Sequence, residues 1–233
     1  MSKVKKIFLP VLMTLAFISL SLFPDLRVTA QADTQDIVVV TGDEAEEFIN
    51  ATQRGVKKGK VDKIAPLSTF DFEKSSVYTV GGGVTVVTVP LSDKYSLPSN
   101  VTVFFNEDNT VLQTNEMLVT KNEAGNFLVE TYLNGSLVKS VDTEIPYLTD
   151  KELLAEEPVN SGIQPMGIGT VAACLGAVLG IGGTVAYLIA VACGSSCVAP
   201  TPVTAVICAA CIGAYAVLGA GGIAGAVACF NYL

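Results

Sequence analysis

Histidine and tryptophan are both absent from this chain of 233 residues. Without histidine, the ordinary Ser-His and Cys-His pairs of nucleophilic catalysis are excluded. The usual zinc ligands are also missing from the charged part of the chain. Without tryptophan, the chain lacks the ring that commonly anchors a segment at a membrane–water interface. We therefore expect no enzymatic activity, no metal ion and no cofactor.

Charge is absent from the last 76 residues, 158–233, which contain no Asp, Glu, Lys or Arg. All six cysteines lie inside this uncharged part. Residues 33–157 instead carry 10 Lys or Arg against 21 Asp or Glu. Such an acidic part is a poor partner for nucleic acid or an anionic membrane. The change in composition predicts two parts, of which the uncharged one needs a cover against water, and the acidic part is the obvious candidate.

The N-terminus has the composition of a secretory signal. A basic start precedes an apolar run over 7–23, and Ala30 and Ala32 are the small residues that signal peptidase requires. Cleavage between Ala32 and Asp33 would remove a signal peptide spanning 1–32. The alternative is an uncleaved N-terminal anchor, for which the apolar run is short. Export would place the cysteines in an oxidising compartment.

Residues 33–150 are expected to form an acidic α+β domain. Thr41 and Glu44 have the spacing of a capping box, with Thr41 as N-cap, and predict a helix over 42–54. Further along, apolar residues alternate with Thr and other polar residues, which is the period of half-buried strands. Turn sequences separate these runs, among them Asn134-Gly135, which favours a tight hairpin. The pattern predicts one helix and an antiparallel β-meander.

No catalytic constellation is visible in this acidic part. Glu44, Glu46 and Glu47 form a cluster of carboxylates whose spacing fits a solvated helix face. Gly81-Gly82-Gly83 is not followed by the Gly-Lys-Ser/Thr of a phosphate-binding loop, so we interpret it as a bulge or turn between strands. Neither feature predicts a binding site.

Residues 151–166 are predicted to be a linker that contains a processing site. The segment begins acidic, and prolines with small polar residues follow from Pro158 onward. Exposed segments of this kind are where proteases cut. An ordinary interdomain connection is the alternative, but charge ends abruptly here. We expect the cut in the region bounded by Glu157 and Pro158 on one side and by Met166 and Gly167 on the other.

Residues 167–233 contain two apolar stretches, 168–192 and 203–228. Each is long enough to cross a hydrocarbon core of ~30 Å as a helix, so a two-span membrane hairpin is one interpretation. Two pairs of glycines have the GxxxG spacing that permits close helix contact in lipid: Gly176 with Gly180, and Gly221 with Gly225.

Glycine clusters count against unbroken spans. Each apolar stretch has such a cluster near its middle, at 180–183 and 219–222, and each interior glycine costs about 1 kcal/mol relative to alanine. No Lys or Arg flanks either stretch to fix an orientation. We therefore expect an all-α, Gly/Ala-rich part with four short helices, stacked as two hairpins held by disulfides: near 169–179, 184–193, 203–218 and 222–231.

Six cysteines, an even number in an exported chain, predict three disulfides among 15 possible pairings. They are Cys174, Cys193, Cys197, Cys208, Cys211 and Cys229. One alternative is a Cys₄ metal site made by the middle four. Another is a set of buried, unpaired thiols in a membrane hairpin. Because a part shorter than about 80 residues rarely holds together by its core alone, disulfides have a physical purpose here.

Three segments carry a family resemblance: Cys193-Gly-Ser-Ser-Cys197, Cys208-Ala-Ala-Cys211-Ile-Gly with the final Cys229, and the acidic start Thr41-Gly-Asp-Glu-Ala-Glu46. With these residues the chain resembles the cysteine-rich halocin-like bacteriocins. The resemblance implies a signal-bearing precursor, a C-terminal part that is released as the toxin, and an N-terminal part that acts as immunity protein. Archaeal members are richer in cysteine, so the resemblance assigns no disulfide pairing.

We therefore expect a secreted bacteriocin precursor that is held transiently at the cell membrane. The Lys-rich start is typical of a general secretory signal and suggests a Gram-positive bacterium. The expected partners are signal peptidase, a processing protease, the chain's own N-terminal domain and the target-cell membrane, which glycine-rich helical hairpins would enter through hydrophobic burial. The alternative is an integral membrane protein with two C-terminal spans and an extracytoplasmic β-rich domain, without a toxic role.

Overall fold

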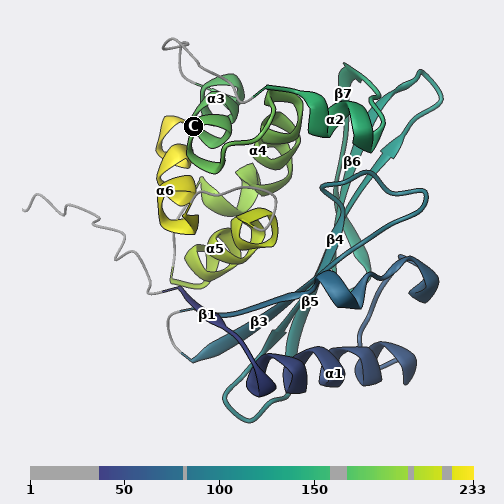
Figure 1. Ribbon diagram of the computed structural model, residues 1–233, viewed down its shortest axis with the longest axis vertical. Coiled ribbons are helices and arrows are strands. Elements are labelled where there is room, and N and C mark those ends of the chain that lie inside the picture. Colours follow the sequence, from purple (N-terminus) through teal and green to yellow (C-terminus); the bar gives the residue numbers. More distant parts are fainter. Residues whose placement is uncertain (1–36, 81–82, 158–166, 199–201, 217–221) are drawn as a thin grey trace, which may run out of the picture. The chain divides into compact units, whose positions relative to one another are not determined.

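The computed structural model describes residues 37–80, 83–157, 167–198, 202–216 and 222–233 (Figure 1). All described residues belong to one compact unit. The predicted signal cleavage between Ala32 and Asp33 lies outside the described residues.

Seven antiparallel strands form one sheet, and their order in space is their order along the chain. Each strand pairs with the next, and only between β1 and β2 do helices intervene. The sheet is therefore a meander. The strands are β1 Val38–Val40, β2 Ser76–Val80, β3 Val84–Pro90, β4 Asn100–Phe105, β5 Val111–Lys121, β6 Asn126–Leu133 and β7 Ser136–Pro146.

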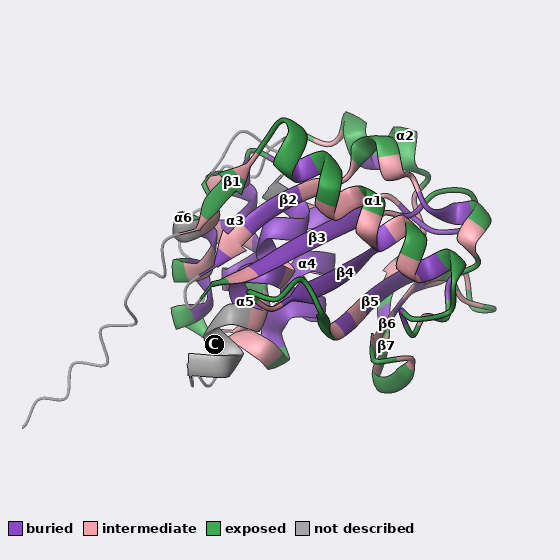
Figure 2. Ribbon diagram, turned by 90° about the horizontal axis from the view of Figure 1, so that it is seen from below, coloured by how far each residue is buried: buried purple, intermediate pink, exposed green. Residues whose placement is uncertain are grey.

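Helices cover both faces of this sheet. The helix α1 lies against one face, and the C-terminal helices α3 to α6 lie against the other (Figures 1 and 2). An α+β N-terminal part followed by a helical C-terminal part was the predicted architecture, and the structure agrees with it. The α-helices are α1 Asp43–Lys57, α2 Asp150–Ala155, α3 Ile168–Leu179, α4 Gly183–Cys197, α5 Pro202–Ala216 and α6 Ile223–Ala228, and the 3-10 helices are η1 Leu67–Thr69, η2 Phe72–Lys74 and η3 Cys229–Tyr232.

The strands bury side chains on both faces because successive residues of a strand point to opposite sides. In β4, Val101 and Val103 belong to the core under α1, whereas Phe104 belongs to the core under α5. Figure 2 shows the resulting buried strands β2 to β4 between α1 and the helices behind them. Two apolar cores thus share one sheet.

The start of α1 differs from the prediction. Its N-cap is Gly42, with φ 70°, and no side chain caps it, so the capping box proposed for Thr41 and Glu44 is wrong. Glycine adopts this left-handed conformation readily and so takes the cap position in place of Thr41. The helix also continues to Lys57 rather than to residue 54. A capping box is present instead at α2, where Thr149 and Glu152 bond reciprocally.

The C-terminal part breaks into short helices at glycines. Gly180, with φ 68°, ends α3 by donating its N–H to the carbonyl of Gly176 at 2.9 Å. The expected break in the first apolar stretch is therefore present. In the second stretch, residues 217–221 lie outside the described part of the chain. Among the described residues, no helix is both long and apolar enough to cross a membrane.

The turn between β6 and β7 follows the prediction. Asn134 and Gly135 are its two central residues, and both have positive φ, 46° and 72°. This conformation is typical of a two-residue hairpin turn that matches the twist of the strands. Gly83, with φ 74°, precedes β3 as expected for a turn between strands, whereas Gly81 and Gly82 lie outside the described residues.

Candidate functional site on the sheet face that carries the C-terminal helices

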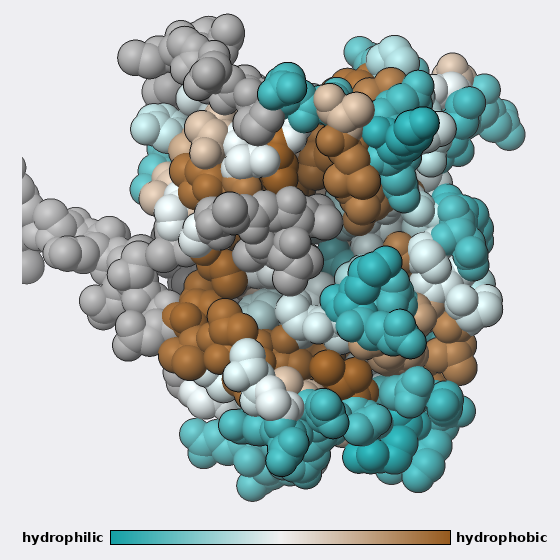
Figure 3. Space-filling model, viewed as in Figure 1, coloured by the Kyte–Doolittle hydropathy of each residue, from teal (hydrophilic) through white to brown (hydrophobic). Residues whose placement is uncertain are grey.

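One face of the sheet carries α3 to α6, and we call it the helix-bearing face. Figure 3 shows polar side chains gathered over α1 and apolar ones gathered above it, towards the C-terminal helices. The uncharged part of the chain thus packs on a surface supplied by the charged part. The buried apolar residues of the helix-bearing face are Tyr78, Val80, Val86, Phe104, Met117, Val119, Phe127 and Val129.

Tyr78 of β2 is the first polar anchor between the sheet and α5. Its hydroxyl donates to the carbonyl of Ala210 at 2.7 Å. A Cβ added at Gly213 would lie only 2.7 Å from the ring carbon that bears this hydroxyl. The ring therefore lies directly on the backbone of α5, at a place where only glycine leaves room.

Tyr215 is the second polar anchor of α5. The Asn100 side chain in β4 donates to the Tyr215 hydroxyl at 3.0 Å, and that hydroxyl donates to the Met117 sulfur at 2.7 Å. Burial raises the pKa of Tyr215 and of Tyr78 above the ordinary value of tyrosine. Both hydroxyls therefore stay protonated at neutral pH and remain donors.

Polar side chains fill the middle of the helix-bearing face. The hydroxyls of Tyr78, Thr88 and Thr102 follow one another at 3.4 and 3.2 Å, and Thr102 donates to Asn100 at 3.2 Å. Asn100 in turn donates to Tyr215, so buried polar contacts extend from one tyrosine anchor to the other. Because Tyr78 and Thr102 give their protons to a helix carbonyl and to Asn100, the single proton of Thr88 serves its contacts with both hydroxyls. Such a network fixes a specific alignment of α5 on the sheet.

Two charged residues of the acidic part bind the helices at their edges. Lys139 of β7 donates to the carbonyl of Val191 in α4 at 2.6 Å. Glu156, in the first part of the predicted linker, accepts from the N–H and the hydroxyl of Thr184, at 2.9 and 2.7 Å. A carboxylate is favourable in the first turn of α4 because the helix dipole places partial positive charge there.

The six cysteines form three disulfides, which confirms the prediction of disulfide bonding. Cys174 pairs with Cys229 and ties α3 to the chain's last turn. The pairs Cys193–Cys211 and Cys197–Cys208 join α4 to α5. The helices are thus a covalently closed body resting on the sheet.

Reduction tests whether the disulfides are present, and digestion of the unreduced protein tests how the cysteines pair. The intact mass should rise by about 6 Da, two hydrogens for each of three bridges. Digestion of the unreduced protein should also link the peptides that contain Cys174 and Cys229. Peptide mass mapping measures both, and an unchanged mass on reduction would contradict the disulfides.

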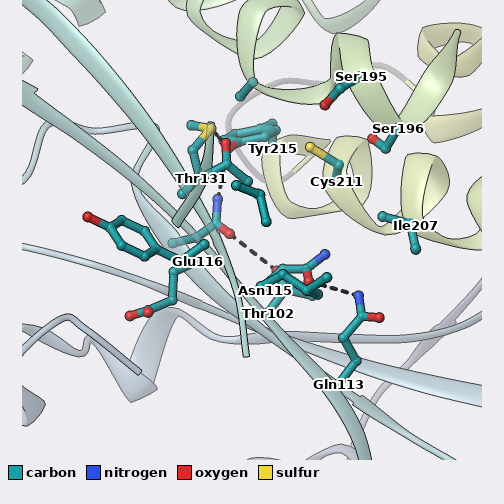
Figure 4. A pocket seen from close by; sticks show the side chains of 16 residues that line it. Thr102, Gln113, Asn115, Glu116, Thr131, Ser195, Ser196, Ile207, Cys211 and Tyr215 are labelled. Carbon is teal, nitrogen blue, oxygen red and sulfur yellow. Dashed lines mark hydrogen bonds between the residues drawn. The ribbon is translucent and has the colours of Figure 1, made fainter. Parts of the chain in front are cut away.

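A cavity of about 220 Å³ separates the helix-bearing face from α4 and α5 (Figure 4). Its floor comes from β4 to β7 and its roof from the two helices. The Glu116 carboxylate points away from it, because that group accepts from the N–H groups of Ile64 and Ala65 at 2.6 and 3.0 Å. Burial raises the pKa of Glu116.

The predicted helix-contact glycines have different places in the structure. Gly176 is buried in α3, and Gly180 is the residue that ends this helix. Gly225 of α6 approaches α3, since a Cβ there would lie 3.1 Å from Val178 Cγ1. Gly221 lies outside the described residues.

The predicted processing region is described only at its ends. Glu157 follows α2, and Gly167 is the N-cap of α3 with φ 134°. Pro158 to Met166 lie outside the described residues. At the first of these ends, Glu156 binds Thr184 of α4.

Among the described residues, no three His, Cys, Asp or Glu side chains are placed to hold a metal ion. The polar contacts that join the two parts come from hydroxyls, an amide, carbonyls, the ammonium group of Lys139 and the carboxylate of Glu156. The arrangement is chemically suited to binding between the acidic and uncharged parts of the chain.

The comparisons with known proteins add no relative: no protein-family model, curated protein or solved structure matches this chain.

Sequence reasoning missed the residues that join the two parts. Tyr78, Asn100, Tyr215 and Glu156 were not singled out. One signal was present in the sequence: Thr88, Asn100 and Thr102 alternate with valines, and alternation alone does not tell a solvated face from one covered by polar contacts.

Proposed function

We propose that this chain is the precursor of a secreted bacteriocin, and that its acidic sheet part binds and shields its own uncharged helical part. A processing protease would cut within the linker, and the disulfide-bonded helices would then act on the membrane of related bacteria. The family resemblance of the cysteine segments supports this proposal. The acidic part would serve as the immunity or pro domain.

The observation that carries the proposal is the polar middle of the helix-bearing face. A face that stays buried for the life of a protein is ordinarily apolar, because buried polar groups need partners. Here Asn100, Thr88 and Thr102 lie between the apolar residues and contact α5 through Tyr215 and Tyr78. In water these groups would bond to solvent instead. The face is therefore suited to losing its helices and binding them again.

After a cut in the linker, no covalent bond would join the sheet part to the helical part. After a cut beyond Glu157, Glu156 would remain with the sheet part while Thr184 would leave with the helices. The two parts would then be held only by non-covalent contacts, including the bonds of Lys139 and Tyr78 to helix carbonyls. The disulfides all lie within the helical part, so none of them opposes release.

The uncharged composition explains why the released helices would move to a membrane. The released part would have no Asp, Glu, Lys or Arg to hold it in water. Its apolar helices would gain by moving from the sheet to a lipid surface, where their side chains are buried again. Glycine breaks would let the short helices rearrange there.

Culture supernatant and a binding assay test the proposal together. The supernatant should contain a neutral peptide of roughly 67–76 residues, the span left by cuts at either end of the linker. The separate sheet part, residues 33–157, should bind this peptide and protect sensitive cells when it is exported. N-terminal sequencing, intact mass and isothermal titration calorimetry measure these outcomes.

A pair of conservative variants distinguishes specific binding from general adhesion. In the sheet part, Tyr78→Phe removes the hydroxyl that reaches Ala210 and should weaken peptide binding about fivefold, the worth of about 1 kcal/mol. Tyr95→Phe is the control, because Tyr95 is buried in the core under α1 and does not line the cavity beneath α4 and α5. Circular dichroism checks that both fold. Full-length protein fixed in the producer membrane, or no protection by the sheet part, would contradict the proposal.

A further inference from the structure

The cavity between the sheet and the helices has mainly apolar walls. Met117 lies on its floor, Ala192, Ile207 and Tyr215 lie on its roof, and Leu133 and Val138 stand at its side. The last two are exposed, 37% and 58%. The apolar wall therefore continues from the cavity to the protein surface, and an elongated apolar group has a way in.

Thr131 lines this cavity (Figure 4), and Lys139, which is not itself a lining residue, lies beside Thr131. The hydroxyl oxygen of Thr131 is buried and has no hydrogen-bond partner in the described part of the chain. Lys139 lies opposite Thr131 on the neighbouring strand, next to Val138. Its ammonium group binds one carbonyl, and no carboxylate of the described residues lies within 4 Å of it.

We propose that this cavity binds a medium-length fatty acid, with its carboxylate on Lys139 and Thr131 and its chain along the apolar walls. A carboxylate accepts strong hydrogen bonds from an ammonium group and from a hydroxyl, so it satisfies both. Loss of water lowers the pKa of Lys139, and a bound anion would reverse this effect. The site requires neither processing nor killing, and so stands apart from the proposed function.

The size of the cavity limits the chain length. An apolar cavity of about 150 Å³ in another protein holds benzene, which has six carbons. By proportion, the 220 Å³ here holds roughly nine non-hydrogen atoms. Octanoate, with about ten non-hydrogen atoms, is close to this estimate, and the end of a decanoate chain would extend towards the exposed Leu133 and Val138.

Calorimetric titration of the chain from Asp33 to Leu233 with a series of fatty acids tests the site. Affinity should rise about fourfold for each added methylene up to octanoate or decanoate, because each is buried, and then level off. Methyl decanoate should bind at least about tenfold more weakly, because it lacks the charge.

Point variants separate this site from general adhesion. Lys139→Met should lower decanoate affinity at least about tenfold, and the isosteric Thr131→Val about fivefold. Lys58→Met is the matched control, since Lys58 is the C-cap of α1 on the opposite face, and it should bind as the parent does. Ala192→Leu fills the cavity and should abolish binding. Thermal unfolding checks that each variant is folded.

Several results would overturn the site. These are no heat with decanoate at millimolar concentration, equal losses in Lys139→Met and Lys58→Met, or an affinity that is independent of chain length. Phospholipid vesicles form a separate arm. Binding to vesicles without binding of free decanoate would mean that the chain recognises a membrane surface and would overturn the carboxylate site.

Discussion

Removing the disulfide between Cys174 and Cys229 should lower the free energy of unfolding by roughly 4 kcal/mol. This bridge spans 55 positions, against 18 for Cys193–Cys211 and 11 for Cys197–Cys208. The entropy that a crosslink removes from the unfolded chain grows with the length of the closed loop. Denaturant unfolding of the Cys174→Ala/Cys229→Ala variant, compared with the parent protein, measures the loss.

The matched control is the pair Cys197→Ala/Cys208→Ala. Its loop is short and lies within the one already closed by Cys193–Cys211, so its removal should cost at most roughly 3 kcal/mol. Alanine is suitable in both pairs because each pair has one buried and one partly buried cysteine, and cysteine packs as a small apolar group. Equal losses in the two variants would show that loop length does not set the contribution of the long bridge.

Local features of this fold were predictable because neighbouring residues determine them. The turn at Asn134 and Gly135 follows from two residues that tolerate positive φ, and Gly180 ends α3 for the same reason. The change in charge at 157–158 needs only the composition. Disulfide pairing was not predictable in this way, because Cys174 meets Cys229 only when α6 folds back on α3.

The candidate site was the least predictable part, and its threonines show why. Alternation of valine with threonine predicts strands with one face in water. In the structure Thr88 and Thr102 are only 1% and 3% exposed, because α5 covers the polar face as well. From the sequence, Tyr78 likewise looks like an ordinary strand residue. Its role depends on a carbonyl 132 positions away along the chain.

Two identical substitutions in the helices should have opposite effects. Gly213→Ala should lower the free energy of unfolding, because its Cβ would lie 2.7 Å from the Tyr78 ring. Overpacking of this kind costs about 1–3 kcal/mol, and displacing the ring also breaks the bond to Ala210. Gly194→Ala, in α4, meets only Leu233 at 3.6 Å and should gain about 1 kcal/mol from helix propensity. Denaturant unfolding of both variants measures the contrast.

A double-mutant cycle assigns the effect to the ring of Tyr78. In a Tyr78→Leu background the side chain is smaller, so the penalty of Gly213→Ala should shrink or vanish, whereas the gain from Gly194→Ala should be unchanged. A coupling of 0.5–3 kcal/mol between positions 78 and 213 is the range expected for residues in contact. If Gly213→Ala costs the same in both backgrounds, α5 is not held by the tyrosine ring. If instead it stabilises the protein as Gly194→Ala does, the close approach of sheet and helix at Gly213 is absent, and with it the specific alignment of the helical part on its acidic partner.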